Sequence, residues 1–533
     1  MTSTPTDPKL SAERFFDEGK PVAYATTKTF DSSGLGAYYK PIEAYEGFHR
    51  FDPDFTWTME EEKKVVRTID WRICTWVCLM FFALQLDRGN ISQALSDNML
   101  GDLKLNTNDY NTGQTIFYVS FLFAEIPSQL ISKRLGPDRW IPVQMVSWSL
   151  VASFQAFLSG RTSFYITRCL LGLIEGGFIP DNILYLSYFY TSSELPGRLS
   201  WFWVSYQSTQ IWSAFFAYGI LHMRGINGMS GWRWLFALEG TLTGLIGIIS
   251  YFYLPPSPCQ TASVFRGKKG WFTEREEKIM VNRVLRDDPS KGDMHNRQAI
   301  SFRMFWDGLM DWHMWPIYLI GLSWLIPNQP VSAYLTLQLR SMGFNTFETN
   351  LLTIPAYVLF IIQLLVWTWF SEKINDRFLL GVAGQLWTLP LLVALLLIPA
   401  NTSHWVKYAL SVMVVGHPYI HAILVAITSR NAGTVRTRTI ASAFYNMCVQ
   451  ASNIVGQNIY RNDDKPMYRR GNKVLIALCV YNIFLFIFAK YFYTSVNKKR
   501  AAKWDAMTTE QKEHYLSTTK DKGNKRLDFR FAH

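Results

Sequence analysis

Repeated apolar runs of about 20 residues are the feature that most constrains how this chain can fold. A helix of that length crosses the hydrocarbon core of a bilayer, where its backbone polar groups must bond to one another. Twelve such runs predict an all-α membrane protein. The predicted spans are 71–90, 112–132, 140–159, 163–190, 200–221, 234–254, 313–336, 350–371, 378–398, 405–426, 440–459 and 473–495.

Three polar segments divide the apolar runs into two sets of six. Residues 1–70 and 496–533 are predicted tails, and residues 255–311 are a predicted connector between units 71–254 and 312–495. The connector has ten Lys/Arg and eight Asp/Glu residues, which is typical of a solvated link. The chain has no phosphate-binding glycine loop, Ser/His/Asp arrangement or zinc-like spacing, so we expect no enzyme, cofactor or metal site.

The net charge of +12 lies beside the ends of the spans, which argues against a nucleic-acid-binding protein. Lys498, Lys499 and Arg500 follow the last span, and basic residues also follow the second, eighth and tenth. Lys and Arg are enriched in cytoplasmic loops, so we predict that both termini are cytoplasmic. Loop 460–472 is basic although predicted to be external, but late loops have less influence on orientation.

Charged residues inside the apolar runs are the candidates for function. The run 163–190 contains Arg168, Glu175 and Asp181, and the first two lie two helical turns apart on one face. An ionisable group at the membrane centre costs about 2.5–3.5 kcal/mol on insertion scales, so it lines a cavity or pairs with a charge. We interpret Arg168 and Glu175 as part of a transport site; a structural ion pair with another helix is the alternative.

The first span ends with Asp87 and Arg88, which are adjacent and therefore project from different sides of a helix. The planar guanidinium of Arg88 can donate in parallel to two oxygens of an anion, which indicates an anion-binding role. The alternative places Arg88 at the external membrane interface. Asp87, and Glu125 of the second span, are further candidates for proton binding.

Prolines mark the seventh span as an interrupted helix. Pro316, Pro327 and Pro330 surround Asn328 and Gln329. Interrupted membrane helices expose backbone groups where they line a cavity, so we interpret the two amides as substrate-binding candidates. A simple kink is the alternative.

Two later spans carry further polar residues. His417 and His421 are four residues apart, which predicts a shared helix face; packing or a proton relay is favoured over metal binding. Asn446, Gln450 and Asn453 form a stripe that contacts another helix or lines a cavity. His421 and Asn446 are included among the substrate-binding candidates.

Several motifs resemble one transporter family. RCLLGLIEGGFIP is similar to the fourth-helix motif R-x-x-x-G-x-x-E-G-x-x-x-P of major facilitator anion symporters. DLKLNTNDYNTGQTIFYV, NGMSGWRWLF and YRNDDKPMYRRGN resemble the fungal allantoate-permease branch. FTEREEKIMVNRVLRDDPSKGDMHNRQ and TTKDKGNKRLDFRF resemble the yeast permease for sulfonates and inorganic sulfur, which is related to alternative sulfate transporters.

The resemblance implies a major facilitator fold of two six-helix bundles that works by alternating access in the plasma membrane. It implies that Arg168 and Glu175 form the conformational and proton-coupling pair and that Arg88 binds the anion. The expected partners are a small anion, protons and the lipid bilayer, and we expect a functional monomer.

A gating motif of the family is altered in this chain. The motif G-x-x-x-D-R-x-G appears here as Gln129-x-x-x-Lys133-Arg134-x-Gly136. Because Lys133 replaces the aspartate, the gating ion pair that this aspartate usually forms is not expected here. The counterpart in the second half keeps an acidic and a basic residue, Asp376 and Arg377.

These observations favour a proton-coupled importer of sulfur-containing anions such as sulfate, sulfite, thiosulfate and sulfonates. One alternative is a proton symporter for organic carboxylates or vitamins such as allantoate, nicotinate, pantothenate or biotin. An alternative of another class is a transporter-like nutrient sensor that signals through the connector or the tails.

Overall fold

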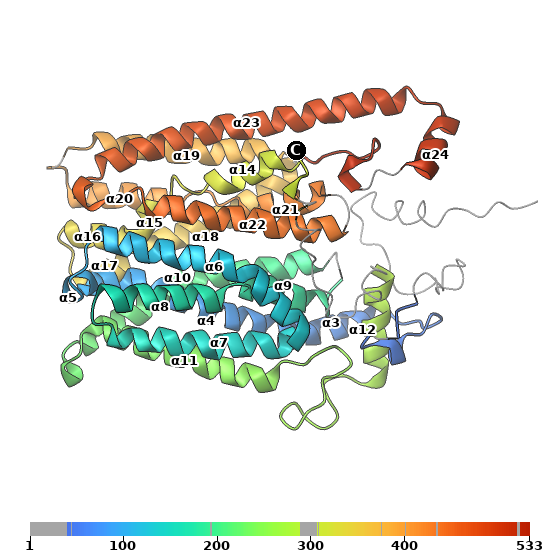
Figure 1. Ribbon diagram of the computed structural model, residues 1–533, viewed down its shortest axis with the longest axis horizontal. Helices are drawn as coiled ribbons and strands as arrows, with labels where there is room; N and C mark the ends of the chain where they lie inside the picture. Colours follow the sequence, from blue (N-terminus) through green and yellow to red (C-terminus); the bar gives the residue numbers. More distant parts are fainter. Residues whose placement is uncertain are drawn as a thin grey trace, which may run out of the picture.

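The computed structural model describes residues 40–43, 45–191, 194–287, 306, 309–374, 376–399, 401–432, 435–519 and 523–533. Within these ranges the regular structure is helical, apart from one isolated β-bridge between Ser263 and Gly267. The long helices lie side by side along the longest axis of the molecule (Figure 1). The predicted all-α fold is confirmed.

Twelve helical segments run along this axis, six from each half of the chain. The segments of the first half are α4 (Thr75–Ala94), α6 (Thr107–Leu135), α7 (Pro137–Phe154), α8 (Arg161–Glu175) with α9 (Phe178–Ser187), α10 (Leu195–Ile220) and α11 (Gly231–Tyr253). Those of the second half are α14 (Trp315–Ser323) with α15 (Gln329–Ala333) and α16 (Leu335–Ser341), α18 (Ile354–Ile374), α19 (Arg377–Leu397), α20 (His404–Val415) with α21 (His421–Asn431), α22 (Val435–Gln457) and α23 (Arg469–Asp505).

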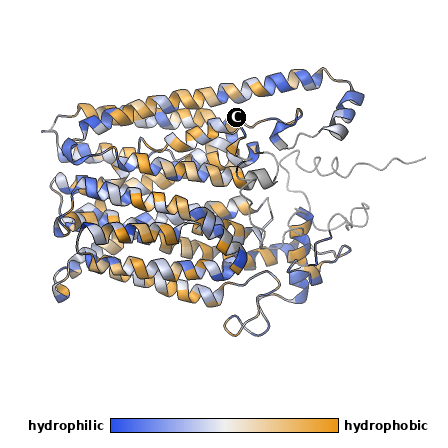
Figure 2. Cartoon of the chain, in the orientation of Figure 1, coloured by the Kyte–Doolittle hydropathy of each residue, from blue (hydrophilic) through white to orange (hydrophobic). Residues whose placement is uncertain are grey.

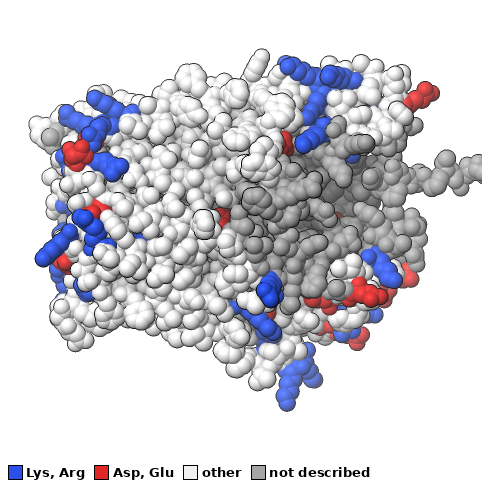
Figure 3. Space-filling model, viewed as in Figure 1, with Lys and Arg blue, Asp and Glu red and all other residues white. Residues whose placement is uncertain are grey.

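The surface of the bundle is suited to lipid. Hydrophobic residues follow the long helices, whereas α24 (Thr509–Thr518) and the last turns of α23 are hydrophilic (Figure 2). Charged side chains gather at the two ends of the face shown in Figure 3 and are nearly absent from its middle. By length and composition, six stretches of the described chain can cross a membrane: Met59–Asp97, Arg161–Ser187, Gly231–Tyr253, Thr346–Ser371, Arg377–Leu397 and Arg469–Asp505.

The two ends of the bundle differ. We call the end that carries α3 (Met59–Ile69), α12 (Glu274–Asp287) and α24 the tail end, and the opposite end the loop end (Figure 1). One hydrophobic core lies within the first half and α12, and another lies within the second half. A third core lies toward the loop end and combines both halves, with residues such as Ile91 and Tyr110 beside Tyr334 and Leu339.

The fourth span is not one continuous helix from 163 to 190, as the sequence predicted. It stops at Glu175 and resumes at Phe178 as α9. Gly177 has a positive φ of 90°, which favours glycine, and a Cβ there would lie 2.4 Å from Ser128 Oγ. The close approach of α6 and the backbone conformation of Gly177 together explain the break.

The seventh and tenth spans are also interrupted. The chain leaves the helical path at 324–328, around Pro327, as predicted; Pro316 and Pro330 instead stand in the first turns of α14 and α15. Residues 416–420 separate α20 from α21. The prediction that His417 and His421 share a helix face is therefore wrong, because His417 lies in that break.

The tail end is organised by α3 and α12. Capping boxes at Thr58/Glu61 and Thr273/Glu276, with the spacing of Thr and Glu that is typical of helix N-termini, begin these two helices. Arg275 of α12 donates to Glu61 of α3 at 2.6 Å, which ties the two helices together. The rest of the connector, at 288–305, lies outside the described residues.

The described part of the predicted C-terminal tail 496–533 packs against the second half of the chain. Helix α23 continues to Asp505, and the last residues return to the second half. Phe531 is buried, and its amide donates to Asn497 Oδ1 at 2.8 Å.

Candidate functional site

An ion pair buried in the first half is the centre of the candidate site. Arg88 Nε on α4 lies 2.6 Å from Glu175 Oε2, at the last residue of α8 before the helix breaks. The side chains are 18% and 1% exposed, respectively. Arg88 therefore lies inside the bundle rather than at the membrane interface. Asp87 points the other way and accepts a hydrogen bond from Trp148 Nε1 at 3.2 Å, as expected for adjacent helical residues.

Glycines bring α8 against α6 beside this pair. A Cβ on Gly172 would lie 2.3 Å from the carbonyl oxygen of Phe117, and one on Gly176 would lie 2.9 Å from that of Phe121. The two helix backbones are therefore in direct contact. The guanidinium of Arg88 lies 5.7 Å from the ring centroid of Phe117 and 4.9 Å from that of Phe121.

Arg168 also lies near Phe117, with its guanidinium 6.0 Å from the ring centroid. It does not pair directly with Glu175, whose carboxylate contacts Arg88 instead. Arg168 donates to Gln155 Oε1, a residue that the sequence analysis missed. Arg168 Nε and Arg88 Nη2 are buried without a hydrogen-bond partner in the described chain. The arrangement thus holds two guanidinium groups with donor capacity left over.

Another buried carboxylate, Glu239 of α11, was also missed. Its carboxylate faces the side-chain amide of Asn90 on α4. One turn further on α11, Thr243 donates to the Ala83 carbonyl at 3.4 Å, so this face of α11 meets α4. The signal was present in the sequence, because Glu239 is the single acidic residue of its apolar span.

The candidates from the second half form separate groups. Asn328 accepts from Thr388 Oγ1 at 3.1 Å, and Gln329 donates to Asn453 Oδ1 at 2.5 Å. His421 is surrounded by aromatic rings: its own ring lies 5.1 Å from Trp203 of the first half and 5.8 Å from Tyr445. The two predicted amides therefore hold helices together within the second half, whereas His421 lies between the halves.

Glu125 joins the two halves near the middle of the bundle. Asn446 Nδ2 of α22 lies 3.5 Å from Glu125 Oε1 of α6, at the outer limit for a hydrogen bond. Among the described residues, the other hydrogen bonds between the halves lie toward the loop end. Among them, Asn111 donates to the Tyr460 carbonyl at 2.8 Å, and Asn350 donates to Ser96 Oγ at 3.0 Å.

The predicted gating residues lie at the tail end. Gly136 ends α6 with a φ of 93°, Arg134 is exposed, and the side chain of Lys133 lies outside those described. Asp376 caps α19 by accepting from the Leu379 amide at 3.3 Å and forms an ion pair with Lys490 of α23. Its neighbour Arg377 is the first residue of α19.

A bundle of membrane-length helices with charged groups buried beside the junction of its two halves defines a polytopic membrane transporter. The sequence profile of the Major Facilitator Superfamily matches residues 77–457. The chain therefore belongs to this superfamily, whose members transport substrates and are not enzymes.

Two relatives show how far the similarity extends. The uncharacterized transporter YIL166C of Saccharomyces cerevisiae is 48% identical over 98% of this chain and 97% of its own length. A putative tartrate transporter of Agrobacterium vitis is 27% identical over 61% of this chain and 69% of its own length.

Solved structures share the fold at low sequence identity. A bacterial homologue of the human lysosomal transporter Spinster, in an inward-facing and occupied conformation, has a TM-score of 0.59 at 12% identity. The alignment covers 79% of this chain and 96% of that one. The Escherichia coli xylose transporter XylE has a TM-score of 0.57 at 16% identity, covering 77% and 96%.

Two matched substitutions test whether Glu175, but not Glu239, is stabilised by an ion pair. Glu175→Gln leaves Arg88 without its anionic partner, so we expect a loss of about 1–3 kcal/mol in the free energy of unfolding. Glu239→Gln removes no ion pair, and we expect a smaller loss or a gain. The stability of each purified variant in detergent is compared with that of the unchanged protein by thermal unfolding. An equal loss in both would contradict the assignment of Glu175 as the paired carboxylate.

Proposed function

We propose that this protein imports sulfur-containing anions together with protons across the plasma membrane, with both termini in the cytoplasm. The observation that carries the proposal is the pair of guanidinium groups, Arg88 and Arg168, which both lie within about 6 Å of the Phe117 ring. Each has a buried N–H group without a hydrogen-bond partner in the described chain. A buried unsatisfied donor costs about 1–3 kcal/mol or more, and an oxyanion would supply the missing acceptors.

The number of oxygen atoms on the anion favours sulfur oxyanions as the substrate class. Sulfate and sulfonate groups present several equivalent oxygens, which can accept hydrogen bonds from two guanidinium groups at once. The motifs in the connector and the C-terminal tail that resemble a sulfonate permease favour this class. The resemblance to a putative tartrate transporter supports the alternative, a carboxylate symporter, because a carboxylate would also satisfy both guanidinium groups.

In the proposed mechanism, the two halves open the central site to one side of the membrane at a time. If the termini are cytoplasmic, the loop end faces outward, and its interdomain contacts close the external side in this conformation. The loop-end contacts comprise hydrogen bonds at Asn111 and Asn350 together with the apolar core around Tyr110 and Tyr334, so opening this end requires both kinds of contact to separate. Opening of the loop end would be accompanied by closure of the tail end around the same site.

Proton coupling is proposed to run through competition for Arg88. When Glu175 is ionised, it holds the Arg88 guanidinium at 2.6 Å. Protonation of Glu175 removes the charge attraction and leaves Arg88 available to the substrate anion. The sequence assigned this coupling to Arg168 and Glu175; the direct contact of Glu175 makes Arg88 the better partner.

The energetics determine how many protons are needed. Moving a dianion inward against 100 mV costs about 4.6 kcal/mol, so two protons neutralise that cost and three make the step favourable. For a monoanionic sulfonate, one proton neutralises the cost and two protons make the step favourable.

Uptake of labelled anions by cells that lack their own carriers tests the proposed function. We expect accumulation of sulfate or a sulfonate that rises at acidic external pH and collapses with a protonophore. Tartrate, nicotinate and allantoate are assayed in parallel. Accumulation of those carboxylates alone would establish the alternative symporter, and no uptake of any compound would favour the nutrient sensor.

Substitutions of Arg88 test anion binding. Lysine keeps the charge but loses the planar fork, so Arg88→Lys is expected to weaken substrate affinity at least about tenfold, and Arg88→Ala to weaken it more. The measurement is the concentration dependence of uptake, normalised to the amount of protein in the membrane. Near-normal uptake by the alanine variant would rule out this role.

Glu175→Gln tests coupling, because the amide mimics a permanently protonated carboxyl group. Proton-driven accumulation should be lost, whereas exchange of labelled for unlabelled anion should remain measurable in vesicles. Asp87→Asn and Glu125→Gln serve as comparisons at the other two proposed proton-binding residues. Retention of pH-dependent accumulation by Glu175→Gln would move the coupling role to one of them.

A further inference from the structure

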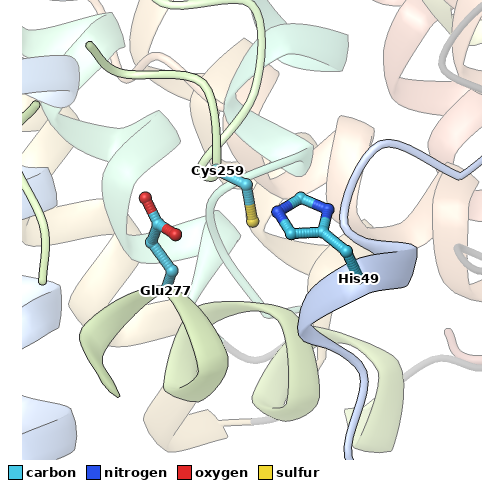
Figure 4. A group of neighbouring side chains, drawn as sticks. All are labelled: His49, Cys259 and Glu277. Atoms are coloured by element: carbon cyan, nitrogen blue, oxygen red, sulfur yellow. The ribbon is translucent and has the colours of Figure 1, made fainter. Parts of the chain in front are cut away.

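Three potential metal ligands from separate parts of the chain meet at the tail end, away from the transport site. They are His49 in the turn Phe48–Arg50, Cys259 in the segment after α11, and Glu277 on α12. One ligand atom from each lies within 4.8 Å of the other two. Figure 4 shows the imidazole, thiol and carboxylate gathered around one small space.

Contacts that do not use the ligand atoms hold two of the segments together. Asn282 of α12 donates to the Arg50 carbonyl at 3.1 Å and accepts from the Asp52 amide at 3.1 Å. Gly47 packs so closely on Val281 that a Cβ would lie 2.7 Å from its Cγ2 atom. The turn that carries His49 is therefore fixed on the helix that carries Glu277.

The segment that carries Cys259 is anchored on both sides. Before it, Tyr185 donates its hydroxyl to the Pro255 carbonyl at 2.8 Å. After it, Thr261 Oγ1 accepts from the Trp271 amide at 2.9 Å. The thiol is consequently presented by a positioned backbone, which reduces the conformational entropy lost on binding a ligand.

We propose that His49, Cys259 and Glu277 bind a divalent transition-metal ion of the Zn²⁺ class. Imidazole nitrogen and thiolate sulfur favour such ions, whereas Mg²⁺ and Ca²⁺ prefer oxygen ligands. Three protein ligands leave the fourth tetrahedral position for water. Ligand atoms in a tetrahedral zinc site lie about 3.5 Å apart, so small side-chain rotations close the present cluster around the ion.

Arg50 supplies the outer contact that such a carboxylate ligand usually has. Its Nε lies 2.9 Å from Glu277 Oε2, and its Nη1 lies 2.5 Å from Glu274 Oε1. A ligand carboxylate is oriented by a hydrogen bond to one oxygen while the other oxygen binds the metal. The bound ion would link the turn Phe48–Arg50 to the segment after α11 and to α12.

Titration of the full-length protein in detergent with Co²⁺ tests the proposal, because a cobalt–thiolate bond gives charge-transfer absorption in the near ultraviolet. We expect one Co²⁺ per chain, displaced by Zn²⁺. Cys259→Ser should abolish the band, and Cys448→Ser, which changes a thiol in α22 of the other half, should preserve it. No band in the unchanged protein, or a retained band in Cys259→Ser, overturns the proposal.

Variants of the other two ligands show whether all three act together. His49→Gln and Glu277→Gln are each expected to weaken Co²⁺ binding at least about tenfold. Glu274→Gln is the matched control, because it removes the second carboxylate partner of Arg50 but no ligand. Equal weakening by Glu274→Gln and Glu277→Gln would overturn the role of Glu277. Circular dichroism and gel filtration establish that each variant is folded.

Discussion

The buried contact between Arg88 and Glu175 is the interaction on which the rest of the site depends. Two opposite charges attract strongly where water is scarce, but removing them from water costs several kcal/mol each. The pair is therefore retained only where close packing holds both groups in position. In this protein, Gly172 and Gly176 provide that packing by allowing α8 to contact α6 directly.

The helix breaks place functional groups where straight helices would not. α8 ends at Glu175, so the carboxylate stands at a helix terminus beside the two-glycine break. In the second half, the tenth span breaks between His417 and His421, and His421 begins α21 among aromatic rings from both halves. Corresponding spans of the two halves thus carry an interruption near the middle of the bundle, where each presents a polar side chain.

Contacts between the halves are unevenly distributed, and this asymmetry matters for transport. The core that combines both halves lies toward the loop end, with amide hydrogen bonds from residues such as Asn111 and Asn350. The first half and α12 share their own core, and α12 also contacts α3 through Arg275 and the end of the fourth span, at the Phe189 carbonyl, through Arg283. Each half thus has a hydrophobic core of its own in addition to the core that both halves share.

The sequence by itself determined the membrane class, the helical fold and most of the span positions. These features follow from local hydrophobicity and length, which act within a single segment. The same information located Arg88, Arg168 and Glu175, because a charge inside an apolar run is visible without a structure. Glu239 could have been found in the same way.

Tertiary structure decided which of these charges meet. Arg88 and Glu175 are 87 positions apart, and their contact depends on how α4, α6 and α8 pack. The spacing of Arg168 and Glu175 on one helix suggested a pair, but side-chain reach favoured Gln155 and Arg88 instead. His49, Cys259 and Glu277 are too far apart in the sequence to form a recognisable metal-binding motif. Long-range contacts of this kind arise from packing between segments, which local pattern and composition do not encode.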